Sequence, residues 1–118
     1  MKSKLKGLVF IAAILVAPST WATQFLATGT VSFLRIFDAS YGYNVVNWIA
    51  VSGFTSAGSC ATVGGRLPLM MKDDVRGQQM LQLAQSARIA NIAVTVSVDD
   101  TYKISNGYCL IQHISIAD

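Results

Sequence analysis

No constellation of catalytic residue types stands out in this 118-residue chain. The one histidine, His113, has no second histidine with which to bind a metal ion. Gly53–Gly58 is one residue too long for the G-x-S-x-G turn of serine hydrolases and lies between predicted strands. Asp99 and Asp100 could divide acid and base roles, but adjacent aspartates in a polar loop are usually turn residues. The sequence therefore predicts a non-enzymatic protein without a metal or cofactor.

Residues 1–22 have the three regions of a secretory signal peptide. Three lysines occur in the first six residues. Leu8–Ala17 is an apolar stretch of ten, and Thr20 and Ala22 are small residues at the positions that signal peptidase reads. The alternative is a membrane anchor, but a bilayer span needs about 20 apolar residues. We expect cleavage after Ala22, a secreted or periplasmic protein, and one domain over residues 23–118.

Removal of the signal peptide would leave no net charge. The whole chain has a formal charge of +3, and three of its nine basic residues are the signal lysines. The six that remain balance the six acidic residues, which are all aspartates. Because nucleic-acid binding relies on positive charge, we expect no nucleic-acid partner. We also expect no membrane span after cleavage.

The mature sequence predicts one helix among strands. The helix is Asp73–Asn91, preceded by a short lead-in and strands and followed by further strands. Its buried face is predicted to carry Gly77, Met80, Leu81, Ala84 and Ala87, and its polar face Gln78, Gln82, Gln85 and Arg88. After a lead-in over Thr23–Thr28, the predicted strands are Thr30–Phe37, Val45–Phe54, Cys60–Met71 with a bend at Gly64-Gly65, Ile92–Val98 and Tyr108–Ile116. Asp99–Gly107 is predicted as a loop.

This order of elements suits a small closed barrel, because closure removes exposed sheet edges. We predict a mainly β, α+β fold: a five-stranded OB-fold-like barrel of order β-β-β-α-β-β. The alternative is an open antiparallel sheet with one helix packed across it. In the barrel the third and fifth strands are neighbours, which would place Cys60 beside Cys109. We predict one disulfide between them; two free thiols or an intermolecular bond are the alternatives.

Two loops flank the binding face of an OB-fold and supply the candidate ligand-binding residues. They are Asp38, Tyr41, Tyr43 and Asn44 after the first predicted strand, and Asp99, Asp100, Tyr102, Lys103 and Asn106 after the fourth. Aromatic rings cover the apolar faces of sugars, while Asp and Asn side chains bind sugar hydroxyl groups. The alternative is that all of them are ordinary turn residues.

The chain also resembles the pentameric B subunits of bacterial A-B toxins. Ala27–Val31 is similar to the start of the first strand in the subtilase-cytotoxin and pertussis-like B subunits. Gln78–Asp118 is similar to the helix and last strand of cholera-type B subunits, although the tyrosines near the end of that helix are absent here. The resemblance implies an exported glycan-binding OB-fold that forms a homopentamer with its helices around a central pore. It also implies that Thr28 contacts sugar, as a serine does in the first group.

Two functions follow from these observations. The first is an exported binding subunit for a glycan or another cell-surface ligand, whose polar helix face meets copies of itself in a ring. The second is a small monomeric periplasmic protein with a structural or envelope-interaction role and no sugar site. An enzyme built on His113 and Asp99 is a third alternative.

Overall fold

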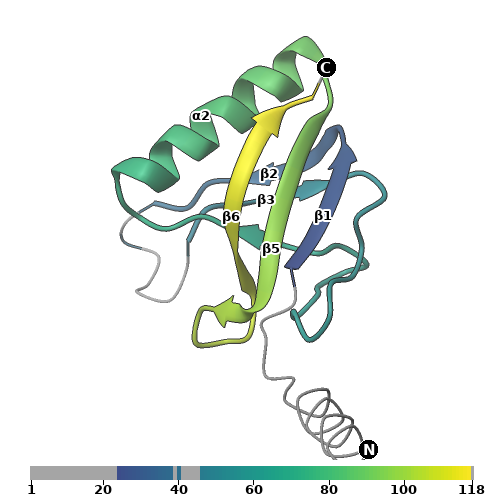
Figure 1. Ribbon diagram of the computed structural model, residues 1–118. Helices are drawn as coiled ribbons and strands as arrows, with labels where there is room; N and C mark the ends of the chain where they lie inside the picture. The colour runs from purple at the N-terminus through teal and green to yellow at the C-terminus, as the bar shows by residue number, and fades with distance from the viewer. Residues whose placement is uncertain (1–23, 39, 41–45, 118) are drawn as a thin grey trace, which may run out of the picture.

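The protein is mainly β with one helix, as predicted. The computed structural model describes residues 24–38, 40 and 46–117. The predicted signal peptide, Tyr41, Tyr43 and Asn44 lie outside the described residues. The strands are β1 (Gln24–Gly29), β2 (Val31–Arg35), β3 (Trp48–Val51), β4 (Leu69–Met70), β5 (Val94–Lys103) and β6 (Cys109–Ile116), and the helix is α2 (Val75–Ala90). In Figure 1, α2 lies across the sheet, and it contacts β6 and β2.

The six strands form one curled sheet in the order β1-β5-β6-β4-β3-β2. All neighbouring strands are antiparallel except β4 and β6, which run parallel and pair through Met70 and Leu110. β1 and β2 stand at opposite ends of this order, although only Thr30 separates them in the sequence. The sheet therefore curls into a half-barrel (Figure 1).

The first strand was not predicted. Thr23–Thr28, expected as a lead-in, contains most of β1, which pairs with β5 from Gln24–Asp99 to Gly29–Val94. The alternation of burial in β1 is weak: Phe25 and Ala27 are only half-buried, while Leu26 is 62% exposed. An apolar side chain thus lies on each face, which hides the two-residue period of a strand. The described chain has six strands rather than the five predicted.

The predicted third strand, Cys60–Met71, consists mostly of turns. Only Leu69–Met70 forms a strand, β4, and Cys60 lies in a turn-rich segment rather than on a strand. Val63 and Arg66 form an isolated bridge around Gly64 and Gly65. Both glycines have positive φ angles, of 57° and 77°, as a two-residue hairpin turn of type I′ requires. The predicted bend is therefore confirmed, but the strand around it is not.

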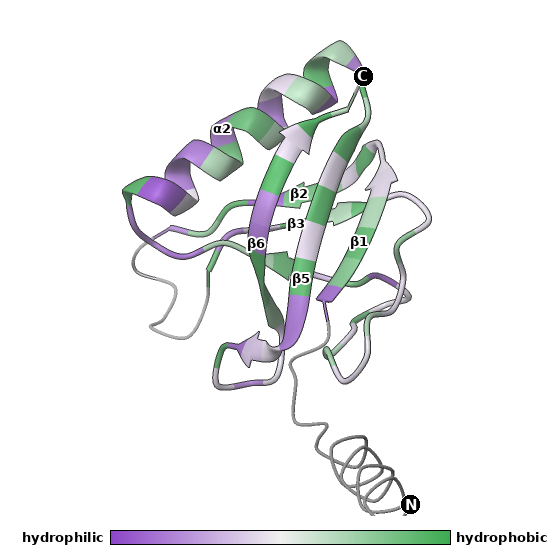
Figure 2. Cartoon of the chain, in the orientation of Figure 1, coloured by the Kyte–Doolittle hydropathy of each residue, from purple (hydrophilic) through white to green (hydrophobic). Residues whose placement is uncertain are grey.

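β5 is longer than predicted. Val94, Val96 and Val98 are fully buried, as predicted, whereas Ile92, predicted on the same face, precedes the strand and is 41% exposed. Figure 2 shows the alternation of hydropathy in β5. The strand continues to Lys103, through half of the predicted loop Asp99–Gly107. Pairing with both β1 and β6 extends the strand over polar residues, since backbone hydrogen bonds do not depend on side-chain polarity.

Both ends of the helix lie where the predicted range, Asp73–Asn91, placed them. Oδ1 of Asp74 accepts a hydrogen bond from the Gly77 amide at 2.7 Å and caps the first turn of α2. Asn91 has the left-handed conformation, with φ 56°, and ends the helix. The buried residues of α2 are Gly77, Leu81, Ala84 and Ala87, and Met80 is half-buried. This is the predicted apolar stripe.

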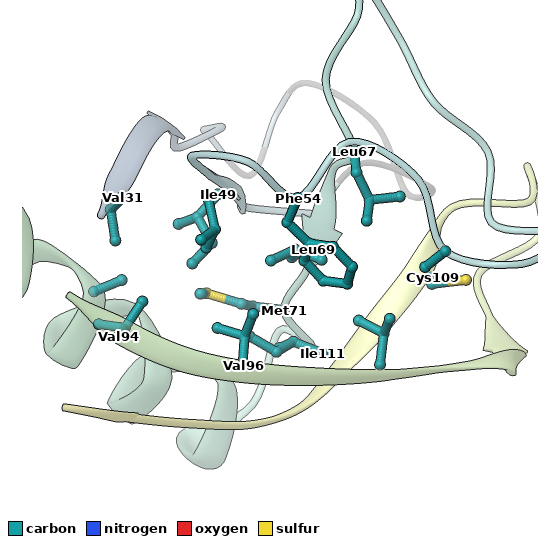
Figure 3. Packing of buried hydrophobic residues seen from close by; sticks show 14 of the residues in the cluster. Val31, Ile49, Phe54, Leu67, Leu69, Met71, Val94, Val96, Cys109 and Ile111 are labelled. Carbon is teal, nitrogen blue, oxygen red and sulfur yellow. The ribbon is translucent and has the colours of Figure 1, made fainter. Parts of the chain in front are cut away.

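The main hydrophobic core fills the inside of the curled sheet (Figure 3). It takes side chains from α2 and from all six strands, with Ile49, Leu69 and Val96 among the fully buried ones. Cys60 and Cys109 are joined by a disulfide, with a Cα–Cα distance of 5.4 Å. The predicted pairing is confirmed, and the described residues contain no free cysteine. The bond fixes the turns before β4 to the start of β6.

Gly77 should not tolerate a side chain, although it lies in a helix. A Cβ atom there would lie 1.8 Å from the carbonyl oxygen of Lys72. Helix propensity alone predicts that Gly77→Ala stabilises α2 by about 1 kcal/mol. We expect instead a loss of about 1–3 kcal/mol in the free energy of unfolding, because the backbone of Lys72 must move. Urea unfolding of Gly77→Ala measures this. Ser86→Ala, an exposed site in the same helix, is the control and should be neutral or slightly stabilising.

The disulfide should contribute much of the stability of this small protein. Its cysteines are 49 residues apart. A loop of this length corresponds to about 4 kcal/mol in the chain-entropy model. We expect the double variant Cys60→Ala/Cys109→Ala to lose a free energy of unfolding of that order in urea titrations. Wild-type protein in reducing buffer should lose a similar amount, and equal stability of its oxidised and reduced forms would contradict the prediction.

Candidate functional site

The outer face of the sheet carries a second hydrophobic cluster, separate from the main core. Trp48, Ala50, Met70 and Leu110 are its buried members, and they come from β3, β4 and β6. Half-buried side chains pack against them: Phe33, Phe37, Val46, Ile104 and Tyr108. An antiparallel sheet usually presents polar residues on the face that does not meet its core. An apolar, aromatic cluster on that face therefore points to a binding role.

A groove of about 190 Å³ lies over this cluster. We call it the aromatic groove; it is lined by Arg35, Phe37, Val46, Trp48, Val63, Pro68, Met70, Ile104, Asn106 and Tyr108. Three connections converge on it: the one between β2 and β3, the one between β3 and β4, and the one between β5 and β6. The first and the last of these belong to the two loops from which the sequence predicted ligand-binding residues. Because pockets for whole small molecules are typically about 300–1,000 Å³, the groove suits one part of a larger ligand.

Aromatic rings and guanidinium groups stack beside the groove. The rings of Phe33 and Trp48 are stacked, with centroids 4.8 Å apart and planes at 19°. Cζ of Arg35 lies 4.9 Å from the Phe33 centroid and 5.6 Å from that of Trp48. Cζ of Arg66 lies 4.3 Å from the Phe33 centroid. Each such contact stabilises by about 0.5–1 kcal/mol at an exposed site and fixes the direction of the side chain.

Local structure explains how these side chains meet. Arg35 and Trp48 are paired in register across β2 and β3, so their side chains share the outer face. Arg66 closes the hairpin turn at Gly64-Gly65, and two backbone hydrogen bonds to Val63, of 3.0 and 2.9 Å, hold it there. The positive charges thus sit on backbone that pairing fixes.

Thr28 lies apart from the other predicted ligand-binding residues. It is exposed on β1, and its Oγ1 is 2.9 Å from Oγ1 of Thr95. Thr95 is near the start of β5, whereas Tyr102 and Lys103 end that strand. Since β5 is extended, the structure does not bring Thr28 together with them.

The aspartate pair is held by local hydrogen bonds. Asp99 is only 8% exposed, and its Oδ1 accepts from the amide and the hydroxyl of Thr101, at 2.8 and 2.7 Å. Asp100 accepts a hydrogen bond from the amide of Ser59 at 3.3 Å through Oδ2. Asp38 similarly accepts from the amide of Ser40, at 2.9 Å. None of the three lines the aromatic groove. The contact of Asp38 matches the turn-forming role that the sequence left as the alternative, whereas Asp99 and Asp100 lie on β5 rather than in the predicted loop.

Tyr102 and Lys103 face other partners. Nζ of Lys72 lies 5.3 Å from the Tyr102 ring centroid, and interaction with the Tyr102 hydroxyl raises the pKa of Lys72 above its ordinary value. Lys72 and Tyr102 line a second hollow, of about 360 Å³, near the start of α2. Nζ of Lys103 donates to Oγ of Ser59 at 2.8 Å. Of the residues named from the two loops that the structure describes, Asn106 is the one that lines the aromatic groove.

Sequence reasoning missed Arg35, Phe37, Trp48 and Tyr108 as site residues. It assigned all four to strands, where aromatic and apolar residues are expected in a core. One signal could have found them. Val45–Phe54 is apolar on both faces, which means that the sheet has an apolar outer face as well as an inner one. Trp48 is the largest side chain on that outer face, and it forms the floor of the groove.

His113 has no catalytic partner in the described part of the chain. It is exposed on β6 and is paired in register with Ser97, whose buried Oγ makes no hydrogen bond with any described residue. The described residues contain no group of three or more His, Cys, Asp or Glu side chains that could hold a metal ion. A membrane-crossing helix is likewise not found in the described ranges, because no helix there is long and apolar enough.

The aromatic groove combines the faces of half-buried rings with the hydrogen-bond donors of an amide and a guanidinium. The rings of Phe37 and Tyr108 supply apolar faces, and Arg35 and Asn106 supply hydrogen-bond donors. No protein-family model matches the sequence, and neither the curated proteins nor the solved structures include a significant match.

Proposed function

We propose that this protein is an exported, non-enzymatic binding module with an OB-fold-like barrel, and that its aromatic groove binds a glycan. One observation carries the proposal: two connections far apart in the sequence converge on an aromatic groove of the outer sheet face. In OB-folds, ligands bind at that face, between those two loops.

The strand order supports the OB-fold interpretation. β1 and β2 can be counted as one strand bent at Thr30, since no other residue separates them. Five strands then remain, with the helix between the third and the fourth. The bent first strand pairs with the second strand at one end and with the fourth at the other, which is how a five-stranded barrel closes. The parallel pair β4 and β6 corresponds to the neighbouring third and fifth strands.

The side chains of the groove suit a sugar ring. Phe37 and Tyr108 are half-buried, so each leaves part of a ring to cover the C–H face of a sugar. Arg35 and Asn106 are exposed and can bind hydroxyl groups. Export is supported by the disulfide between Cys60 and Cys109, because such bonds persist in oxidising compartments.

A matched pair of tyrosine variants tests the site. The mature chain, residues 23–118, is screened on a glycan array, and the strongest binder is titrated by calorimetry. We expect Tyr108→Ala to weaken binding about tenfold, because a sugar–ring contact is lost. Tyr102→Ala removes an exposed tyrosine outside the groove and should change affinity less than about twofold. If Tyr102→Ala weakens binding and Tyr108→Ala does not, the site is the hollow beside α2. If no glycan binds at all, a structural role in the envelope is favoured.

The toxin resemblance adds an assembly to the proposal, a homopentameric ring around the polar face of α2. In the single chain, Gln78, Gln82 and Arg88 are exposed, which leaves that face open to other copies. Arg88 also donates to the carbonyl of Val31 at 2.6 Å, so its side chain is fixed against β2. Light scattering of the mature protein should give the mass of five chains. The mass of a single chain would contradict the ring, and the resemblance would then be one of fold alone.

A further inference from the structure

Arg35 and Arg66 both pack against the ring of Phe33. Their guanidinium carbons lie 4.9 and 4.3 Å from its centroid, so the two carbons are less than 10 Å apart. Both side chains are exposed. Among the described residues neither guanidinium forms an ion pair with a carboxylate. Like charges within this distance repel each other, and contact with the aromatic ring offsets only part of that repulsion.

The carboxylates of Asp38, Asp74, Asp99 and Asp100 accept hydrogen bonds from other described residues. Asp73 and Asp74 precede α2, and Asp99 and Asp100 lie on β5, where they are engaged with Thr101 and Ser59 as described above. Asp38 is nearest in the sequence, and its carboxylate accepts hydrogen bonds from Ser40. A bound anion would therefore supply the charge that the chain does not.

The two arginines come from different elements, which restricts the geometry of the anion. Arg35 extends from β2 and lines the aromatic groove, whereas Arg66 extends from the hairpin turn that also places Val63 in the groove. One guanidinium fork is enough to bind the two oxygens of a planar carboxylate. Two guanidiniums held against one ring from separate elements suit an anion with three terminal oxygens, such as a sulfate or phosphate ester, which can bridge them.

We infer that Arg35 and Arg66 form a subsite for a tetrahedral oxyanion at the edge of the aromatic groove, and that the ligand is a glycan bearing a sulfate or phosphate ester. This inference rests on the proposed glycan-binding function. The rings of the groove hold the sugar, and the two guanidiniums select the charged substituent. The zero net charge of the mature chain does not argue against this subsite, because the two guanidiniums act on the anion at short range.

Calorimetry with matched glycans tests the subsite. The probes are a chondroitin 4-sulfate hexasaccharide, the unsulfated chondroitin hexasaccharide, which keeps its carboxylates, and a mannose 6-phosphate disaccharide beside the unphosphorylated disaccharide. We expect the sulfated or the phosphorylated member of a pair to bind at least about tenfold more tightly than its counterpart without the ester, and less tightly as salt is added. Which pair shows the preference assigns sulfate or phosphate.

Arginine variants test whether Arg35 and Arg66 cause the preference for the ester. Arg35→Gln and Arg66→Gln should each abolish the preference for the ester, whereas Arg76→Gln, which removes the same charge from exposed α2, should preserve it. Arg35→Lys and Arg66→Lys keep the charge but lose the fork, so their preference should fall between that of the wild type and that of the glutamine variants. Thermal unfolding shows whether each variant is folded. If a glutamine variant is not folded, the lysine variant at the same position is used for the test instead.

Several results would overturn the subsite. Equal binding of the esterified and plain probes would do so, as would an equal loss in Arg76→Gln or tighter binding of an oligothymidylate than of either ester. If the plain glycans bind and Tyr108→Ala weakens them, the groove remains a glycan site without an anion subsite. If no glycan probe binds, the proposed function fails together with the subsite.

Discussion

The fold depends on a tight bend of the backbone between β1 and β2. At this bend Ser52 donates a backbone hydrogen bond to the Thr30 carbonyl at 2.9 Å. A Cβ atom on Gly29 would lie 2.5 Å from the Ser52 carbonyl oxygen, so the two chain segments can approach only because residue 29 is glycine. The bend sends β1 to β5 and β2 to β3. Without it, a six-stranded sheet would remain open and its inner face would be too flat to enclose a core.

Curling gives β3 an unusual position, buried on both faces. Its four residues, Trp48–Val51, are all buried, and they alternate between the two hydrophobic clusters. Ile49 and Val51 join the main core, while Trp48 and Ala50 belong to the outer cluster. The strand that stabilises the interior is therefore also the floor of the aromatic groove. A rigid strand beneath a site keeps its side chains in fixed directions, as recognition requires.

The sequence predicted those parts of the fold in which local patterns are strong. The caps of α2, the valines of β5 and the partner of Cys60 all follow from residue type and spacing. It failed where tertiary pairing overrides weak patterns: β1 is a strand because β5 binds it, and Cys60–Met71 is mostly turns because glycines bend it. The aromatic groove was not predicted residue by residue. Asn106 lines it, whereas Asp38 and Asp99 accept hydrogen bonds from nearby residues, and a strand aromatic, Trp48, forms its floor.

The pairing of β1 with β5 has a consequence for the order in which the chain folds. Thr28 and Thr95, which are hydrogen-bonded across these strands, are 67 residues apart. β5 and β6, in contrast, are joined by a short connection and pair locally. Contacts between distant residues form late, because a long loop must close first. β1 therefore has no sheet partner until β5 has been synthesised, and the half-barrel is completed by a pairing that spans most of the described residues.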